Sequence, residues 1–167
     1  MPLKHSFPPI AAPDARVLVL GSLPGDRSLA AQRYYAHPQN QFWQLMSPVA
    51  GRDLAVLDYD DRLAALRDAR VALWDVIGSA RRAGSTDAAI ADIEGNDLPA
   101  LIAMLPDLRA IGFNGGTALK HGRTLLGPDF AGAQIVALPS SSPLHTIGLA
   151  AKLPAWTALA AFLVDRD

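Results

Sequence analysis

The chain of 167 residues has the size of one ordinary domain, with 50% hydrophobic and 19% charged residues. Its formal net charge of −1 excludes a protein that holds nucleic acid by bulk charge alone, but is compatible with a local basic rim. Cysteine is absent, which excludes disulfides, zinc–thiolate sites, iron–sulfur clusters and cysteine nucleophiles.

No secretory signal and no membrane-spanning segment are predicted. The longest uninterrupted apolar run, residues 158–164, is far shorter than the roughly 20 residues that a spanning helix needs. The chain does not open with a basic segment followed by an apolar one. We therefore expect a cytoplasmic protein with no membrane partner, and we expect a monomer because nothing in the sequence indicates an obligate oligomer.

Short apolar strands alternate with helical patterns along the chain. The proline-rich residues 1–15 are predicted to be an extended lead-in, and residues 16–167 a single domain. Strands are predicted at residues 16–20, 71–77, 109–113 and 134–138. Helices are predicted at residues 42–49, 60–69, 98–105, 115–126 and 153–164. This alternation predicts an α/β fold, a three-layer α/β/α sandwich around a central, mainly parallel sheet of about four strands.

Ligands of such a sheet bind beyond the carboxyl ends of its strands, so the loops after the strands hold the candidate site residues. The loop after the first strand, residues 21–28, lacks the patterns of a P-loop, a dinucleotide fingerprint and a nucleophile elbow. Its glycines allow backbone to approach a ligand closely. We expect Gly25 and Ser28 to contact phosphate there.

Residues 34–43 combine aromatic rings with amide side chains, which suits a nucleobase pocket because rings stack on a base and amides read its edge. Either Tyr35 or Phe42 is predicted to stack on the base, and His37 and Asn40 lie between them. The alternative is that Phe42 and Trp43 open a helix and pack into the core.

The second and third strands end in polar side chains. Asp75 follows Trp74 at the end of an apolar strand, where a carboxylate needs a hydrogen-bond partner. It either caps a loop or accepts a hydrogen bond from a ligand N–H. Asn114 precedes two glycines at the start of a helix, where it either contacts phosphate or caps the helix.

Three consecutive serines between prolines follow the fourth strand. The hydroxyl and backbone N–H groups of Ser140, Ser141 and Ser142 could hold a phosphate. Leu144 and His145 would project at the tip, where an apolar side chain can wedge into a base stack. The alternative is an ordinary turn. A basic rim could be formed by Arg27, Arg33, Lys120, His121, Arg123 and Lys152, with Arg81 and Arg82 near a possible phosphate path.

Two of these loops together resemble the motifs of the uracil-DNA glycosylase superfamily. Gly21-Ser-Leu-Pro-Gly25 with Tyr35-Ala-His-Pro-Gln-Asn-Gln-Phe-Trp43 is similar to the first motif, and Leu138-Pro-Ser-Ser-Ser142 to the second. The resemblance covers roughly residues 16–164. Uracil-cleaving branches carry an Asp or Asn before the proline of the first motif, where this chain has Ser22 and Leu23. Together with Trp74 and Asp75, this departure resembles the hypoxanthine (deoxyinosine) branch.

The resemblance implies a monofunctional DNA glycosylase that flips a deaminated base out of damaged double-stranded DNA, and the base expected is hypoxanthine. It implies that Asn40 is catalytic. We predict that Asp75 is the second catalytic residue and reads the base, because the second strand supplies the base-reading residue in related enzymes, and that Ser22, Leu23 and His37 also line the base pocket. Neither a metal nor another cofactor is expected. The alternatives are a mismatch-specific uracil or thymine glycosylase and a non-catalytic nucleotide- or phosphate-binding module. A small hydrolase that pairs Ser22 or Ser141 with His37 or His145 is a weaker alternative, because no elbow motif is present.

Overall fold

The computed structural model of this chain describes residues 3–85 and 87–165, and it confirms the predicted α/β sandwich. The central sheet is parallel and has the order β3-β2-β6-β7. Its strands are β2 (Val17–Gly21), β3 (Val71–Asp75), β6 (Ala110–Asn114) and β7 (Gln134–Leu138). Gly21 pairs with Asp75 and Asn114 with Leu138, so all four carboxyl ends lie along one edge of the sheet.

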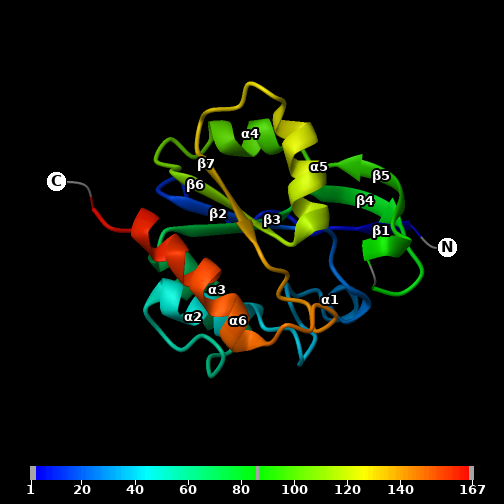
Figure 1. The fold of residues 1–167 in the computed structure, drawn as a ribbon, viewed down its shortest axis with the longest axis horizontal. Coiled ribbons are helices and arrows are strands. Elements are labelled where there is room, and N and C mark those ends of the chain that lie inside the picture. The colour runs from blue at the N-terminus through cyan, green and yellow to red at the C-terminus, as the bar shows by residue number, and fades with distance from the viewer. Residues whose placement is uncertain (1–2, 86, 166–167) are drawn as a thin grey trace.

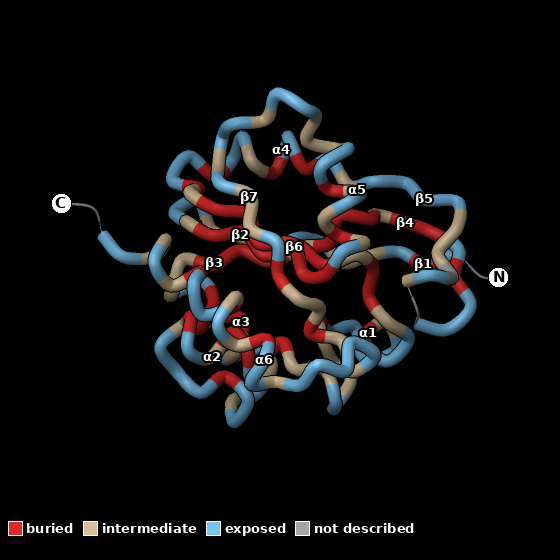
Figure 2. The backbone as a smooth tube through the Cα atoms, in the orientation of Figure 1, coloured by how far each residue is buried: buried red, intermediate tan, exposed pale blue. Residues whose placement is uncertain are grey.

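Helices cover both faces of this sheet (Figure 1). One layer contains α2 (Phe42–Ala50), α3 (Tyr59–Asp68) and α6 (Leu149–Thr157), and the other α4 (Leu98–Ala103) and α5 (Gly116–Leu126). Side chains of a strand alternate between the two faces, so Val17 and Val19 join the first core while Leu18 and Leu20 join the second. The buried strands run through the middle of Figure 2.

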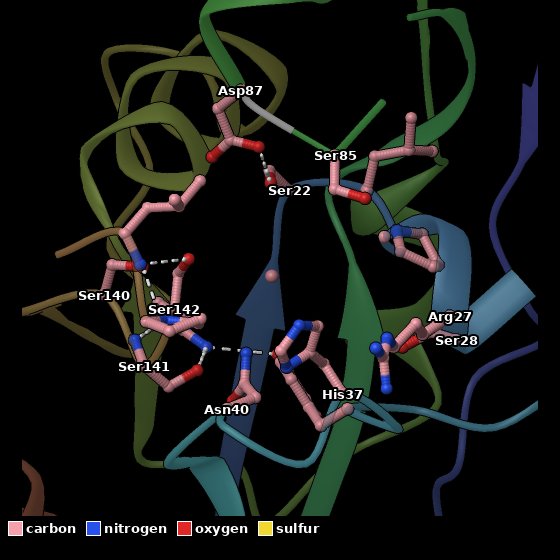
Figure 3. Close-up of a pocket in the computed structure, with 18 of the residues that line it drawn as sticks. Ser22, Arg27, Ser28, His37, Asn40, Ser85, Asp87, Ser140, Ser141 and Ser142 are labelled. Atoms are coloured by element: carbon pink, nitrogen blue, oxygen red, sulfur yellow. Dashed lines mark hydrogen bonds between the residues drawn. The ribbon is translucent and has the colours of Figure 1, made fainter. Parts of the chain in front are cut away.

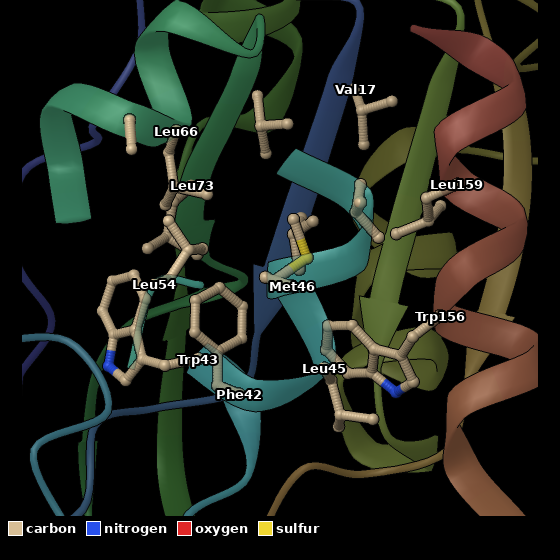
Figure 4. Packing of buried hydrophobic residues seen from close by; sticks show 14 of the residues in the cluster. Val17, Phe42, Trp43, Leu45, Met46, Leu54, Leu66, Leu73, Trp156 and Leu159 are labelled. Atoms are coloured by element: carbon tan, nitrogen blue, oxygen red, sulfur yellow. The ribbon is translucent and has the colours of Figure 1, made fainter. Parts of the chain in front are cut away.

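The first core is built around aromatic residues of α2 and α6 (Figure 4). Phe42 is fully buried between Trp43 and Trp156, and both contacts are edge-to-face, with ring centroids 4.9 Å and 5.9 Å away. Trp156 also donates its indole N–H to the carbonyl of Pro139, at 2.9 Å. The core therefore anchors the start of the serine loop.

A second sheet, which was not predicted, adjoins the first. It is antiparallel, has the order β1-β4-β5, and contains β1 (Leu3–His5), β4 (Ile77–Arg81) and β5 (Ala91–Gly95). The predicted strand at 71–77 is thus two strands, because the chain passes from one sheet to the other at Val76. The N-terminal segment contributes β1, and Phe7 accepts a 2.7 Å hydrogen bond from the Trp74 indole.

Three helical segments also differ from prediction. A short helix, α1 (Asp26–Ala31), follows β2, and a 3-10 turn, η1 (Asp87–Ala89), lies between β4 and β5. The predicted last helix begins earlier, at Leu149, and continues as the 3-10 segment η2 (Ala158–Phe162). None of the helices formed by the described residues is long and apolar enough to cross a membrane.

Candidate active site

The loops at the carboxyl ends of the parallel strands surround a cavity of about 710 Å³ (Figure 3). The structure brings to its wall all of the predicted site residues except Phe42. They are Ser22, Leu23, Gly25, Ser28, Tyr35, His37, Asn40, Asp75, Asn114, Ser140, Ser141, Ser142, Leu144 and His145. Segments that are far apart in the sequence therefore form one cleft, and the contacts of each side chain show what it can offer a ligand.

Of the two predicted stacking residues, only Tyr35 reaches the cavity. Phe42 lies behind it, with the two rings stacked at a centroid distance of 3.9 Å and an angle of 15°. The prediction that Phe42 contacts the base is therefore corrected, because this side chain is fully buried in the core and supports Tyr35. The Tyr35 hydroxyl accepts a 3.2 Å hydrogen bond from Asn114 Nδ2, which fixes the ring from its other end.

Asp75 is buried at the end of β3, and only 3% of its surface is exposed. Its Oδ2 has no hydrogen-bond partner among the described residues. Gly21 leaves the space in which this carboxylate lies, since a Cβ there would be 2.6 Å from Asp75 Oδ1 and 2.8 Å from the Tyr35 hydroxyl. An unpartnered buried acceptor of this kind is costly, so it points to a ligand that donates a hydrogen bond.

Burial raises the pKa of the Asp75 carboxyl from 3.8 to about 7; the negative charge of Asp87 adds to this, and Arg82 opposes it. Between pH 3.8 and about pH 7, the Asp75 carboxyl is protonated in the folded protein but ionised in the unfolded chain. The stabilisation from this proton is complete below the unfolded pKa and is lost as pH rises through about 7.

We expect the substitution Asp75→Asn to stabilise the protein at alkaline pH, because it removes this buried charge. Each unit of raised pKa corresponds to about 1.4 kcal/mol, so the free energy of unfolding at pH 9 should rise by up to about 4 kcal/mol. Urea unfolding of both proteins at pH 4 and pH 9 measures this. An equal difference at both pH values would contradict the assignment of a buried titrating carboxyl.

Asn40 and His37 both present hydrogen-bond donors to the cavity. Asn40 Oδ1 accepts the backbone N–H of Phe42 at 3.0 Å, so its NH₂ group faces the cavity (Figure 3). His37 Nδ1 accepts the backbone N–H of Gln39 at 3.1 Å, which leaves Nε2 as the N–H of the neutral ring. Donors directed into a cleft stabilise negative charge that develops on a bound group.

Asn114 and Ser141 form the framework of the site, and their contact with DNA stays a prediction. Asn114 Nδ2 donates to the hydroxyls of Tyr35 and Ser141, and its Oδ1 accepts the Ser141 N–H at 2.8 Å. The Ser141 carbonyl accepts the N–H of Gln41 at 2.9 Å. Both side chains are buried, and these hydrogen bonds join the serine loop to residues 34–43.

Ser140 and Ser142 keep hydroxyl protons for a ligand. Their oxygens accept backbone N–H groups of Ser142 and Leu144, at 3.1 Å and 3.2 Å, which leaves each O–H free to donate. Leu144, at the tip, is 65% exposed. Lys152 was expected on the basic rim, but it is buried and donates to the Ser142 carbonyl at 3.2 Å. Its role is to hold this loop from beneath.

The loop after β2 contributes one exposed cation. Arg27 lines the cavity and makes no ion pair with the described residues, whereas Ser28 is buried and accepts the N–H of Ala36 at 3.1 Å. Arg82 is fully buried and donates to the carbonyls of Pro24 and Gly84, so it does not reach a phosphate path. Arg27 is therefore the side chain of this loop best placed to meet a phosphate.

Sequence reasoning missed the contribution of the segment between β4 and β5. Ser85, Asp87 and Ala88 line the cavity, and Ser22 Oγ donates to Asp87 Oδ1 at 2.9 Å. The sequence signal for this segment was weak. Because the second sheet was not predicted, these residues looked like an ordinary polar loop. No cluster of three or more metal-ligating side chains is found in the described parts of the chain.

Known proteins are similar to this chain over most of its length. A family model described as the uracil DNA glycosylase superfamily matches residues 8–160, which include every residue of the cavity wall. A Methanosarcina acetivorans protein named hypoxanthine DNA glycosylase is 40% identical over 140 residues, covering 84% of this chain and 87% of that protein. A protein of the same name from Methanosarcina barkeri is 42% identical over 112 residues, covering 67% of this chain and 71% of that protein.

A solved structure is also similar. It is a solution NMR structure of a Methanosarcina acetivorans protein described as a candidate uracil DNA glycosylase, and its TM-score to this chain is 0.85. The two sequences are 37% identical, and the match covers 96% of this chain and 98% of that one. The similarity therefore extends over the whole sandwich and is not confined to the motifs.

Proposed function

Because the chain belongs to the uracil-DNA glycosylase superfamily, we propose that it is a monofunctional DNA glycosylase that releases hypoxanthine from deoxyinosine in DNA. The observation that carries the choice of base is the Asp75 carboxylate, with a buried oxygen that no described residue satisfies. Hypoxanthine has an N1–H donor where adenine has an acceptor. Asp75 would accept from hypoxanthine and repel adenine. The names of the two Methanosarcina relatives support the same substrate.

The remaining wall of the cavity suits a flipped nucleotide. Tyr35 would stack on the base, with Ser22, Leu23 and His37 beside it. The Asn40 NH₂ group would donate to the departing purine as negative charge develops on it. No lysine lines the cavity among the described residues, which supports hydrolysis without a Schiff base.

Damaged double-stranded DNA is the proposed partner of a monomeric enzyme. Gly25, Ser140 and Ser142 would contact phosphates, and the exposed Leu144, next to His145, would fill the space that the flipped base leaves. A net charge of −1 implies that few cations carry this binding.

We expect Arg27→Gln to weaken binding to inosine-containing duplex by roughly tenfold at low salt, because one phosphate contact is lost. The slope of log K against log salt should fall by about one. Fluorescence anisotropy titrations from 50 to 300 mM salt measure both quantities. Arg67→Gln is the matched control, because Arg67 is exposed on α3 and does not line the cavity. An unchanged salt slope for Arg27→Gln would remove this residue from the interface.

The function is tested by base release from duplexes that carry inosine, uracil, a G·T mismatch or xanthine. Release of hypoxanthine faster than the other bases is the expected result. Preferred release of uracil or thymine would support the mismatch-specific alternative and overturn the argument from Asp75. Binding of free nucleotides without release of any base would support the alternative of a non-catalytic module.

A further inference from the structure

Asp87 reaches the cavity from the second sheet. It is not among the site residues that the sequence predicts. It belongs to η1, between β4 and β5, and 41% of its side chain is exposed. Ser22 Oγ donates to Asp87 Oδ1 at 2.9 Å, and the Arg82 guanidinium lies 3.5 Å from the same oxygen. The structure records no hydrogen bond to Oδ2 from any described residue, so this oxygen is free to accept one from a ligand or a water.

The other acidic and imidazole groups of the cavity wall have other partners or roles. Asp26 pairs with Lys4, and Asp75 is buried and is proposed above to bind the base. The Nδ1 lone pair of His37 is occupied by Gln39. His145 lies on the exposed tip of the serine loop. Asp87 is partly exposed, the Ser22 hydroxyl holds one of its carboxylate oxygens, and its other oxygen is free to accept a hydrogen bond.

Its position also suits a reaction in which two groups act from opposite sides. In Figure 3, Asp87 and Asn40 lie at opposite ends of the cavity. A nucleophilic water and the leaving base occupy opposite faces of the sugar C1′ when the glycosidic bond is displaced in line. A base at one end and a hydrogen-bond donor at the other match this requirement, as paired groups do in glycoside hydrolysis.

We propose that Asp87 is a catalytic residue of this site and that its carboxylate accepts the proton of the water that attacks C1′. This inference rests on the proposed glycosylase function. The C1′–O bond forms as the C1′–N9 bond breaks, and the electron pair of the broken bond goes to the purine. The water proton passes to Asp87 and then to solvent, while the purine anion takes a proton from solvent. Ser22 is the positioning residue that orients the carboxylate.

The test is single-turnover release of hypoxanthine by wild type, Asp87→Asn and Ser22→Ala over a range of pH. We expect Asp87→Asn to lower the rate by about 10²-fold and to abolish the fall in rate at acidic pH. Ser22→Ala should lower it by about tenfold and move that fall to higher pH, because a donor to the charged carboxylate is lost. Binding to inosine duplex should change less than threefold in both variants.

The matched control is Asp92→Asn, an exposed carboxylate of β5 that pairs with Arg81 and does not line the cavity. It should leave the rate unchanged. An acidic fall in rate that persists in Asp87→Asn, or a rate equal to wild type, would overturn the role of Asp87. If Asp87→Asn does not fold, judged by thermal unfolding, a wild-type pH profile in Ser22→Ala would overturn it. Absence of base release by the wild type would instead refute the proposed function.

Discussion

Hypoxanthine release should fall about 10³-fold in the variant Asp75→Ala, which removes the acceptor proposed for the purine N1–H. The flipped base would then bury a donor without a partner, and sites built around such hydrogen bonds reject unmatched groups strongly. Single-turnover rates on inosine duplex measure this loss. The effect should be specific to the chemistry of the base, so binding to an abasic-site duplex should stay close to that of wild type.

Asp75→Asn is the informative comparison. Its amide oxygen can still accept from the N1–H of hypoxanthine, so most activity on inosine should remain. The amide can also turn and donate to N1 of adenine, so the preference for inosine over adenine should narrow. If Asp75→Ala keeps wild-type activity, or if Asp75→Asn discriminates as sharply as wild type, Asp75 does not read the base.

Asn40→Ala should lower the single-turnover rate by about 10³-fold, the effect of removing one donor from a site that stabilises developing charge. Part of any stability loss would come from the hydrogen bond between Asn40 Oδ1 and the N–H of Phe42. Asn40→Asp separates these two effects. It keeps an acceptor for the start of α2 but offers no donor to the cavity, so it should fold normally and remain inactive. An active Asn40→Asp protein would refute the role of the NH₂ group.

Much of the fold follows from simple pattern reading. The apolar runs that form the parallel strands were predicted because a sheet covered on both faces needs continuous hydrophobic segments. The C-terminal ends of those strands then gave the location of the site. Asp75 could be singled out because a carboxylate that ends an apolar strand is unusual, whereas only the resemblance to the glycosylase motifs singled out Asn40 among the amides of residues 34–43.

The errors have physical causes. Periodicity does not reveal that the strand after Arg70 turns into a second sheet at Val76, and Asp87 was missed with that sheet. The two aromatic predictions failed to distinguish Tyr35 from Phe42, because Tyr35 adopts a left-handed backbone conformation, with φ of 52°, that redirects the chain before α2. Sequence also cannot show that the Asn114 amide is fully engaged inside the protein.

The amide of Asn114 has a consequence for how the enzyme meets DNA. One side chain connects the ring proposed to stack on the base with the loop proposed to hold the phosphates. The two halves of the recognition surface are thereby assembled as the protein folds, and little conformational entropy remains to be lost when a duplex arrives. Because such a preorganised site changes little on binding, the DNA must undergo most of the deformation. Lesions in weakly paired base pairs should therefore be flipped out most readily.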